Sequence, residues 1–513
     1  MKRICASLLL LALSSCAEHG LAPEAAPPAP SELLPAGLRR LSRAEYDQAL
    51  SALLGEPVRV SDALPPDLRQ SGFTRNAEQI VDPWLASLLH EQASALAERW
   101  VSTHLPNLCD DACVRSTALG LATRAFNRAP EAAELDRYVA LVEAEAPDTK
   151  AGLGALLTAL LESPKLIYVS ELGASSDAAP RRLKAYELAS SLAWAISGMP
   201  PDSELRERAA SLYDATVREA EARRLLTHSD ARFHYRRFVS EWLGLDGLES
   251  RVKDARLFPD FLDLRPLLQA DSDAFIDRAM IANQGSLATL LSGGLENVPA
   301  PLRALYGLAP DQPGSVAELA ALGRVGILQQ PSFLAATAHE DNSGPVLRGV
   351  TVLRRLLCRE LPAPSELGIE LTFPAPDPSS TTRERYAAHA RDAACAACHR
   401  AIDGVGFSFE NFDAEGRLRQ TEAGKPIDSS GSIRLGGADV ALSDSVALSR
   451  ALSHDAEAEA CLARQVFRFA SGRRDASAEQ AFVDGLAARE RGSILELFVA
   501  FVKRPHFVWR RQP

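Results

Sequence analysis

The sequence lacks the marks of several common protein classes. It has no P-loop, no complete GxGxxG, no HExxH and no GxSxG motif, so the usual signatures of nucleotide binding, zinc proteolysis and serine hydrolysis are missing. Beyond its first residues, the chain of 513 residues has no apolar run of the roughly 20 residues that a membrane-spanning helix needs. No basic run is dense enough to follow a phosphate backbone, and the net charge is -11. Nucleic acid is therefore not expected as a partner.

The first residues have the order of a bacterial export signal. Lys2 and Arg3 precede an apolar stretch over residues 4–13, and Leu13-Ser14-Ser15-Cys16 forms a lipobox. We expect residues 1–15 to be removed and Cys16 to carry diacylglyceryl and acyl (palmitate-type) chains, which would hold the protein stably at a membrane. The alternative is an ordinary signal peptide that happens to have a cysteine near its cut. The lipobox predicts a cell-envelope lipoprotein facing the periplasm or cell surface, and Ala17 favours the outer membrane.

The remaining chain is predicted to be mainly α and multi-domain. Residues 16–37 are rich in Ala and Pro and are interpreted as an extended tether. A capping box at Ser42 to Glu45 begins a helix that Gly55 ends. Helical periodicity recurs at 83–102, 112–127, 131–145, 150–162, 183–197, 216–227, 231–243, 264–282, 346–357, 443–452, 457–471 and 490–502. The strand pattern is confined to a short hairpin near 425–442.

Two glycine pairs are fragments of a dinucleotide-binding pattern without its third glycine. They are Gly152-Leu153-Gly154 and Gly404-Val405-Gly406. Neither follows a predicted strand, so we interpret both as turn glycines.

The clearest chemical motif is Cys395-Ala-Ala-Cys398-His399. Two thiols at this spacing can add to the two vinyl groups of a haem, and the adjacent histidine can take the proximal position on its iron. Covalent haem of this kind is attached outside the cytoplasm, which agrees with export. The sequence therefore predicts one haem c. A disulfide or redox dithiol is one alternative, and zinc held by His389, Cys395, Cys398 and His399 is another.

Four further cysteines remain after the signal, the lipobox and the haem motif. They are Cys109, Cys113, Cys358 and Cys461, an even number that permits two disulfides in an oxidising compartment. The short gap between Cys109 and Cys113 favours their pairing, at a helix start or in a loop. Four buried free thiols are the alternative.

The second axial ligand of the iron cannot be the methionine of small class I cytochromes. The only methionines are Met1, Met199 and Met280, and none follows Cys395. Other candidates are His339, His389, His454, His506 and, through long-range folding, Met199. We favour His339, because His389 precedes Cys395 on an expected helix over 382–397 and should lie on the proximal side. An open position would suit peroxide or oxygen chemistry.

Several blocks of the chain resemble one known family. The run CAACHRAIDGVGFSFENFDAEGRLR is similar to the hallmark of the planctomycete-cytochrome-type multi-domain lipoproteins, whose domains are of unknown function. LRRLSRAEYDQALSALLG, ALLESPKLIYVSELG, FHYRRFVSEWLGLDGLE, VGILQQPSFLAATAHEDNSGPVLRG and ACLARQVFRFASGR resemble its other blocks, in the family's order. Many relatives carry a second CxxCH near the N-terminus, and this chain has none there.

The resemblance implies five helical domains, at 38–105, 106–175, 181–315, 320–422 and 430–513. The fourth of these contains the CxxCH motif. Cys358 and Cys461 fall in family-like blocks of the fourth and fifth, so their pairing would tie the haem domain to the C-terminal domain.

Three functions follow from these observations. The first is an electron-transfer or redox subunit that serves an exported partner protein, because one haem and a lipid anchor occur without another catalytic signature. The second is a haem enzyme with an open axial site, which the length of the chain favours. The third is a structural or surface-binding lipoprotein in which CxxCH is a disulfide or metal site. The sequence does not decide whether the protein is catalytic.

Overall fold

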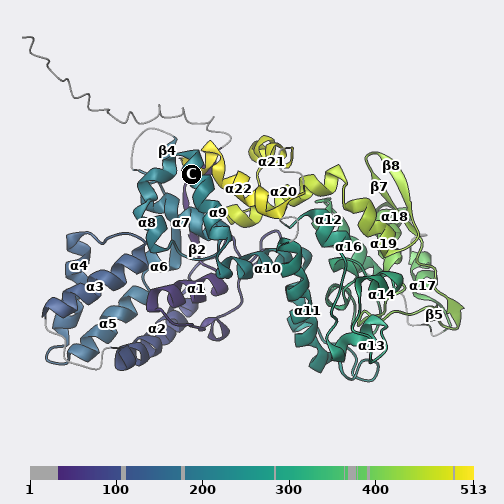
Figure 1. Cartoon of the computed structure of the whole chain (residues 1–513), viewed down its shortest axis with the longest axis horizontal. Helices are drawn as coiled ribbons and strands as arrows, with labels where there is room; N and C mark the ends of the chain where they lie inside the picture. Colours follow the sequence, from purple (N-terminus) through teal and green to yellow (C-terminus); the bar gives the residue numbers. More distant parts are fainter. Residues whose placement is uncertain are drawn as a thin grey trace, which may run out of the picture.

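The fold was analysed in a computed structural model of the whole chain. It describes residues 33–104, 111–174, 180–281, 285–362, 364–367, 377, 379–389, 393–488 and 492–512. Its described residues are mostly helical, and their strands form only small sheets of two or three members, which confirms the predicted mainly α class. Figure 1 shows an elongated molecule with the first helices at one end, the helices of residues 261–452 at the other, and the C-terminal helices along the top between them. None of the helices in the described ranges is long and apolar enough to cross a membrane.

The helices at the N-terminal end share one hydrophobic core. The first, α1 (Arg43–Leu54), begins at Ser42, whose side chain and that of Glu45 form the predicted capping box, and it ends at the left-handed Gly55. Side chains such as Leu50, Leu96 and Leu157 fill the core. The other helices around it are α2 (Pro83–His104), α3 (Asp111–Phe126), α4 (Ala132–Ala144), α5 (Thr149–Leu161) and α6 (Pro164–Ile167).

A second and larger core is continuous through the rest of the molecule. Trp242, Val352 and Phe498 belong to it although they are far apart in sequence. Its longer helices are α7 (Ala185–Ile196), α9 (Ala215–Leu226), α10 (Ser229–Leu243), α11 (Phe261–Ile281), α16 (Pro345–Leu356), α18 (Ala393–Gly406), α19 (Ser445–Leu452), α20 (Ala456–Ser471), α21 (Gln480–Ala487) and α22 (Ile494–Lys503). Short helices complete it, namely α8 (Ser203–Glu207), α12 (Leu287–Ser292), α13 (Arg303–Tyr306), α14 (Val316–Ala321) and α15 (Pro331–Ala336). The remaining short helix is α17 (Thr382–His389). The division into five domains stays a prediction beside these two cores.

The strands tie distant parts of the chain together. The N-terminal β1 (Leu34–Pro35) runs parallel to the C-terminal β9 (Trp509–Arg511), which also pairs with β4 (Arg181–Arg182). Strand β2 (Gly37–Arg40) is antiparallel to β3 (Tyr168–Glu171). The first described residues therefore lie beside the end of the chain.

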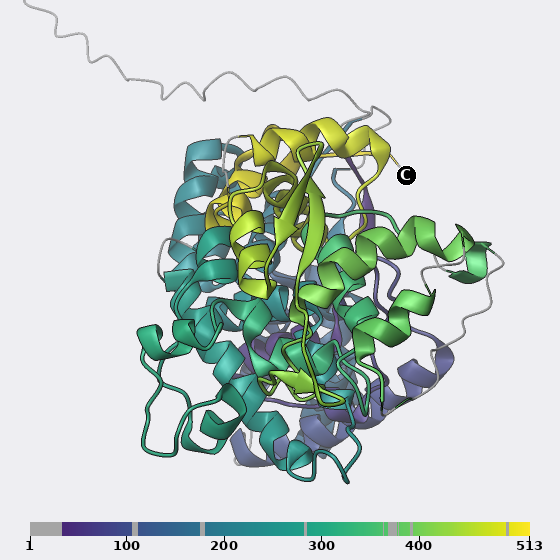
Figure 2. The same ribbon diagram turned by 90° about the vertical axis from the view of Figure 1, so that its right-hand side faces the viewer.

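The predicted hairpin region holds two small hairpins. Strands β7 (Gly431–Leu435) and β8 (Ala438–Leu442) pair antiparallel, and β5 (Thr421–Glu422) pairs with β6 (Lys425–Pro426). The segment at Lys425 therefore pairs with the strand that precedes it, β5. The reason is the tight turn between them, which Ala423 and Gly424 make with positive φ. Figure 2 faces this end of the molecule and shows the longer hairpin lying along its surface.

Buried charges join the two cores. Glu45 accepts hydrogen bonds from Arg39 at 2.7 Å and 3.0 Å and from Arg75 at 2.7 Å. Arg75 also donates to the carbonyl oxygens of Trp194 and Ala470. Burial alone would raise the pKa of Glu45, but the guanidinium groups of Arg39 and Arg75 hold it far below its usual range. Glu45, which completes the capping box of α1, is therefore also the anion that holds Arg75. Through Arg75 it links the start of the chain to Trp194 and Ala470.

Candidate functional site

The haem motif lies in the first half of α18. Residues 395, 398 and 399 are separated by three and four positions, so they share one face of this helix. Cys398 is half-buried against the second core and carries a free thiol. The side chain of Cys395 lies outside the described residues, although its backbone belongs to α18.

His399 is oriented by a carboxylate one turn further along α18. Its Nδ1 donates to Asp403 Oδ1 at 3.1 Å, and the Asp403 side chain is nearly buried. This hydrogen bond raises the pKa of His399, and partial burial opposes the rise. A carboxylate on one ring nitrogen fixes the tautomer and raises the basicity of the other nitrogen, which is the arrangement that proteins use for histidine ligands to metals. The sequence interpretation missed Asp403, although its i+4 spacing from His399 was a usable signal.

The second half of α18 packs against α16 with almost no space. A Cβ added at Gly406 would lie 2.1 Å from the Pro345 carbonyl oxygen, and one added at Gly349 would lie 2.2 Å from the Ile402 carbonyl oxygen. Gly404 meets strand β7 in the same way, since a Cβ there would lie 2.5 Å from the Ser432 carbonyl oxygen. These glycines allow two helices and a strand to approach backbone to backbone.

The interpretation of the two glycine pairs as turns was wrong. Gly404 and Gly406 lie in α18, and Gly152 and Gly154 lie in α5. Gly152 is needed for close packing, because an added Cβ would lie 2.7 Å from the backbone of Val142. Local chemistry favours turns at such pairs, whereas here the tertiary contact of two helices overrides that preference. The helix expected over 382–397 is described as helical at Thr382–His389 (α17) and from Ala393 onward (α18), and the residues between these ranges lie outside the described part.

The segment after α18 is held by a buried arginine of α16. Arg348 donates through Nη1 to the carbonyl oxygens of Phe409 and Phe412, at 3.1 Å and 2.9 Å. Its Nη2 donates to the carbonyl oxygens of Leu334 and Asp413, at 3.2 Å and 2.7 Å. Burial lowers the pKa of Arg348 to about 10. The hallmark run that follows the haem motif is therefore fixed largely by one side chain.

A second buried arginine supports the same segment. Arg324 donates to the carbonyl oxygens of Gln329, Leu305 and Gly416, and its guanidinium lies 4.4 Å from the ring centroid of Phe412. The sequence interpretation missed both arginines. For Arg348 a signal existed, because it shares the apolar face of its helix with Val352, one turn later.

The loop that carries His339 lies against the residue before α16, because a Cβ added at Gly344 would lie 3.2 Å from His339 Cδ2. Burial raises the pKa of Tyr386 on α17, the carboxylate of Glu410 raises it further, and Arg385 opposes the rise. His339 itself donates its backbone N–H to Asn342 at 3.1 Å, and burial lowers the pKa of its ring.

The remaining ligand candidates lie in several places. His389 is the last residue of α17, and its side chain lies outside the described residues. His454 is exposed between α19 and α20, and His506 packs on Phe482 beyond α22. Met199 lines a cavity of about 270 Å³ between α1 and α7. Figure 1 shows α7 and α18 in separate parts of the molecule, which argues against Met199 as a ligand of the same iron.

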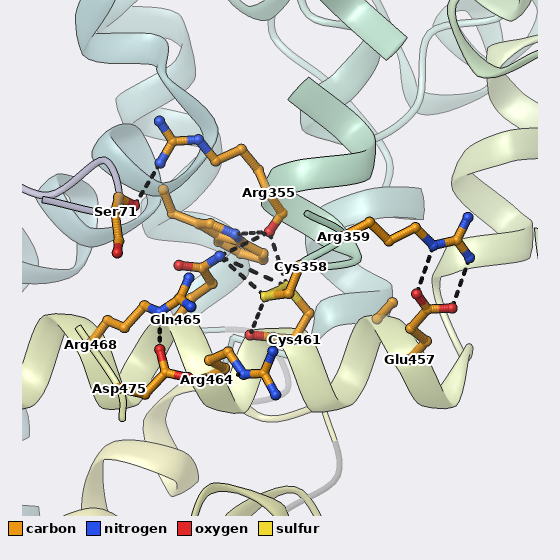
Figure 3. The surroundings of a disulfide bond; sticks show 12 residues. Ser71, Arg355, Cys358, Arg359, Glu457, Cys461, Arg464, Gln465, Arg468 and Asp475 are labelled. Atoms are coloured by element: carbon orange, nitrogen blue, oxygen red, sulfur yellow. Dashed lines mark hydrogen bonds and ion pairs between the residues drawn. A yellow bond between two sulfur atoms is a disulfide. The ribbon is translucent and has the colours of Figure 1, made fainter. Parts of the chain in front are cut away.

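Cys358 and Cys461 form a disulfide, with 5.4 Å between their Cα atoms and a sequence separation of 103. The bond joins the second residue after the end of α16 to the middle of α20 (Figure 3). Cys113 is also disulfide-bonded. Its expected partner Cys109, like the predicted lipid site Cys16, lies outside the described residues.

No group of three or more His, Cys, Asp or Glu side chains arranged for a metal ion occurs among the side chains that the structure describes. This finding does not extend to Cys395 or His389. The zinc alternative for the motif therefore stays untested.

Three families of domains match the chain in order. They are PSD3, protein of unknown function (DUF1587), over residues 39–102; PSD4, protein of unknown function (DUF1592), over residues 183–308; and PSCyt3, protein of unknown function (DUF1588), over residues 324–422. Together they cover more than half of the chain, and the third includes Cys395, Cys398 and His399. No curated protein and no solved structure matches. The chain belongs to the planctomycete-cytochrome-type multi-domain family, whose matched domains have no assigned function.

Proposed function

We propose that this protein is an exported, lipid-anchored redox subunit with one covalent haem c, which exchanges electrons with an exported partner protein. The observation that carries the proposal is the hydrogen bond from His399 Nδ1 to Asp403, one turn along the helix from the CxxCH motif. Histidine ligands of metals in proteins are usually oriented by such a hydrogen bond from the second ring nitrogen.

The residues present fit a c-type haem. Cys395 and Cys398 would each form a thioether with a vinyl group, and the free thiol of Cys398 agrees with that role. His399 would provide the proximal nitrogen, while Asp403 keeps its ring in one tautomer and raises its basicity. A haem bound there supplies reversible one-electron exchange. The names of the matched families, which point to a cytochrome type, support the same assignment.

The N-terminal sequence supports the location. Lipid on Cys16 and a tether over residues 16–37 would keep the helical body close to a membrane of the cell envelope. Replacing Cys16 with alanine should release the protein from membranes or stall its processing, as measured by fractionation. Equal membrane retention of the variant would contradict lipid anchoring.

A visible and near-infrared spectrum tests the haem site. Full-length protein made in a host with c-type maturation should show a haem spectrum in both oxidation states. Cys398→Ser should lose most covalent haem, whereas Cys113→Ser, at a cysteine of α3 in the N-terminal part, should keep it. A colourless wild-type protein, or one that binds zinc instead, would overturn the proposal.

The same spectrum addresses the second axial ligand, for which His339 is our candidate. His339→Ala should convert a low-spin spectrum into a high-spin one, while the exposed His454→Ala should leave it unchanged. A high-spin wild-type spectrum would instead indicate an open axial position and favour the haem-enzyme function over the carrier.

A further inference from the structure

A cleft of about 850 Å³ opens beside the Cys358–Cys461 disulfide. Three segments far apart in sequence line it: the loop at Ser71 and Gly72, the end of α16 with residues 357–362, and α20 with residues 474–480. Figure 3 shows the side chains of α16 and α20 gathered around the disulfide, with Arg355 reaching to Ser71. The volume is typical of a pocket for a small ligand.

The lining of the cleft is strongly basic in an acidic protein. Its described lining residues include six arginines, which are Arg354, Arg355, Arg359, Arg464, Arg468 and Arg474. They include only three carboxylates, on Glu360, Glu366 and Asp475. The chain as a whole has a net charge of -11, so this excess of positive charge is a local feature.

The arginines are unequally neutralised. Arg359 binds both oxygens of Glu457, at 2.7 Å and 2.8 Å. Arg464 and Arg468 share the single carboxylate of Asp475. Arg354 and Arg355 form no ion pair with any carboxylate in the described ranges; both donate to backbone carbonyl oxygens instead.

Arg355 is held in the cleft by the shape of the opposing loop. Its Nη1 donates to the Ser71 carbonyl oxygen at 2.9 Å. Gly72, with φ of 97°, leaves room for the guanidinium, because a Cβ there would lie 1.5 Å from Arg355 Nη1. Burial lowers the pKa of Arg355; Asp246 opposes this, whereas the like charges of Arg69, Arg468 and Arg354 lower it further. Such crowding of positive charge is relieved when an anion binds.

The disulfide fixes the spacing of the two arginine-bearing helices. Arg355 precedes Cys358 by three residues, and Arg464 follows Cys461 by three residues. Between them, Gln465 Nε2 donates to the Arg355 carbonyl oxygen at 3.4 Å. The covalent link therefore keeps the end of α16 beside α20, and arginines of both helices line one cavity.

We propose that this cleft is a binding site for a small, multiply charged oxyanion ligand bearing carboxylate or phosphate groups. The planar guanidinium fork matches both groups, and several arginines around one cavity select for more than one negative charge. The site lies on different residues from the haem motif, so its failure would leave the redox proposal intact.

Calorimetric titration of the full-length protein with citrate and with pyrophosphate tests the cleft. At low salt we expect saturable binding of at least one probe, weakened by added sodium chloride. Tighter citrate binding would assign a carboxylate ligand, and tighter pyrophosphate binding a phosphate ligand. Absence of saturable binding of either probe would overturn the proposal.

Charge variants locate the site. Arg354→Gln and Arg464→Gln should each weaken binding at least tenfold, and Glu360→Gln should tighten it about twofold or more. Arg59→Gln, an exposed arginine of the N-terminal part, makes the same charge change elsewhere and should leave the affinity within twofold. Equal losses in Arg354→Gln and Arg59→Gln would show a general charge effect and contradict a site in the cleft.

Discussion

The two halves of the segment around the CxxCH motif are built in different ways. The segment from Ile402 to Arg419 is held by contacts with the rest of the fold. Gly406 lets α18 touch α16, and Arg348 of α16 donates hydrogen bonds to four backbone carbonyl oxygens, three of them in this segment. From Cys395 to His399, the described side chains are half-buried, and the hydrogen bond from His399 Nδ1 to Asp403 orients the ring of the histidine. We call the segment from Cys395 to His399 the chemical half of the hallmark sequence. The segment from Ile402 to Arg419 is the scaffold half, which holds the chemical half in place.

The largest expected effect comes from Arg348 of α16, which supports the scaffold half. Arg348→Met should lower the free energy of unfolding by about 3–5 kcal/mol, because several buried carbonyl oxygens lose a charged donor at once. Urea unfolding followed by tryptophan fluorescence measures this loss. Cys398→Ser, in the chemical half, should change the stability of the haem-free protein by less than about 0.5 kcal/mol. Equal losses in the two variants would remove the distinction between the halves.

A matched pair of helical glycines gives the next largest effect. Gly406→Ala should destabilise by about 1–3 kcal/mol, since the new methyl group collides with the Pro345 backbone. Gly154→Ala in α5 meets nothing within 4 Å and should stabilise by about 0.5–1 kcal/mol through helix propensity. The same unfolding experiment compares them. A neutral or stabilising Gly406→Ala would show that α16 and α18 do not touch at this glycine.

Among these variants, Asp403→Asn should change the free energy of unfolding least. Its main effect should be on the reduction potential of the haem. Loss of the carboxylate weakens the basicity of the His399 ring, so the reduction potential of the haem should rise, by roughly 59 mV for each tenfold change in relative ligand affinity. Redox titration monitored in the visible spectrum measures the shift. Asp403→Glu should restore much of the original potential. An unchanged potential in Asp403→Asn would mean that the carboxylate serves the fold only.

The local features of the fold could be predicted from the sequence. Capping residues and apolar periodicity are local signals, so the helix from Ser42 to Gly55 and the helices at 83–102 and 457–471 appear close to their predicted bounds. Gly404 and Gly406 could not be interpreted locally, because Gly406 packs against Pro345 of α16, about 60 residues earlier, and Gly404 packs against Ser432 of β7, later in the chain. The same holds for the Glu45 network, whose arginine partner reaches Ala470.

The candidate site was predictable only in part. The motif names Cys395, Cys398 and His399 through their spacing, which is a property of the sequence alone. The neighbourhood of the His339 loop, the carbonyls held by Arg348 and the arginines of the cleft depend on contacts between separate segments. No periodicity or spacing encodes such contacts, so they emerged only from the fold.

Covalent haem attachment is the central claim, and denaturing electrophoresis with haem-dependent peroxidase staining tests it most directly. Wild-type protein matured in a competent host should stain after denaturation, because two thioether bonds survive it, and its intact mass should exceed that of the polypeptide by one haem. A protein that does not stain and has the bare polypeptide mass, whether Cys395 and Cys398 are joined or hold a metal, would contradict the account.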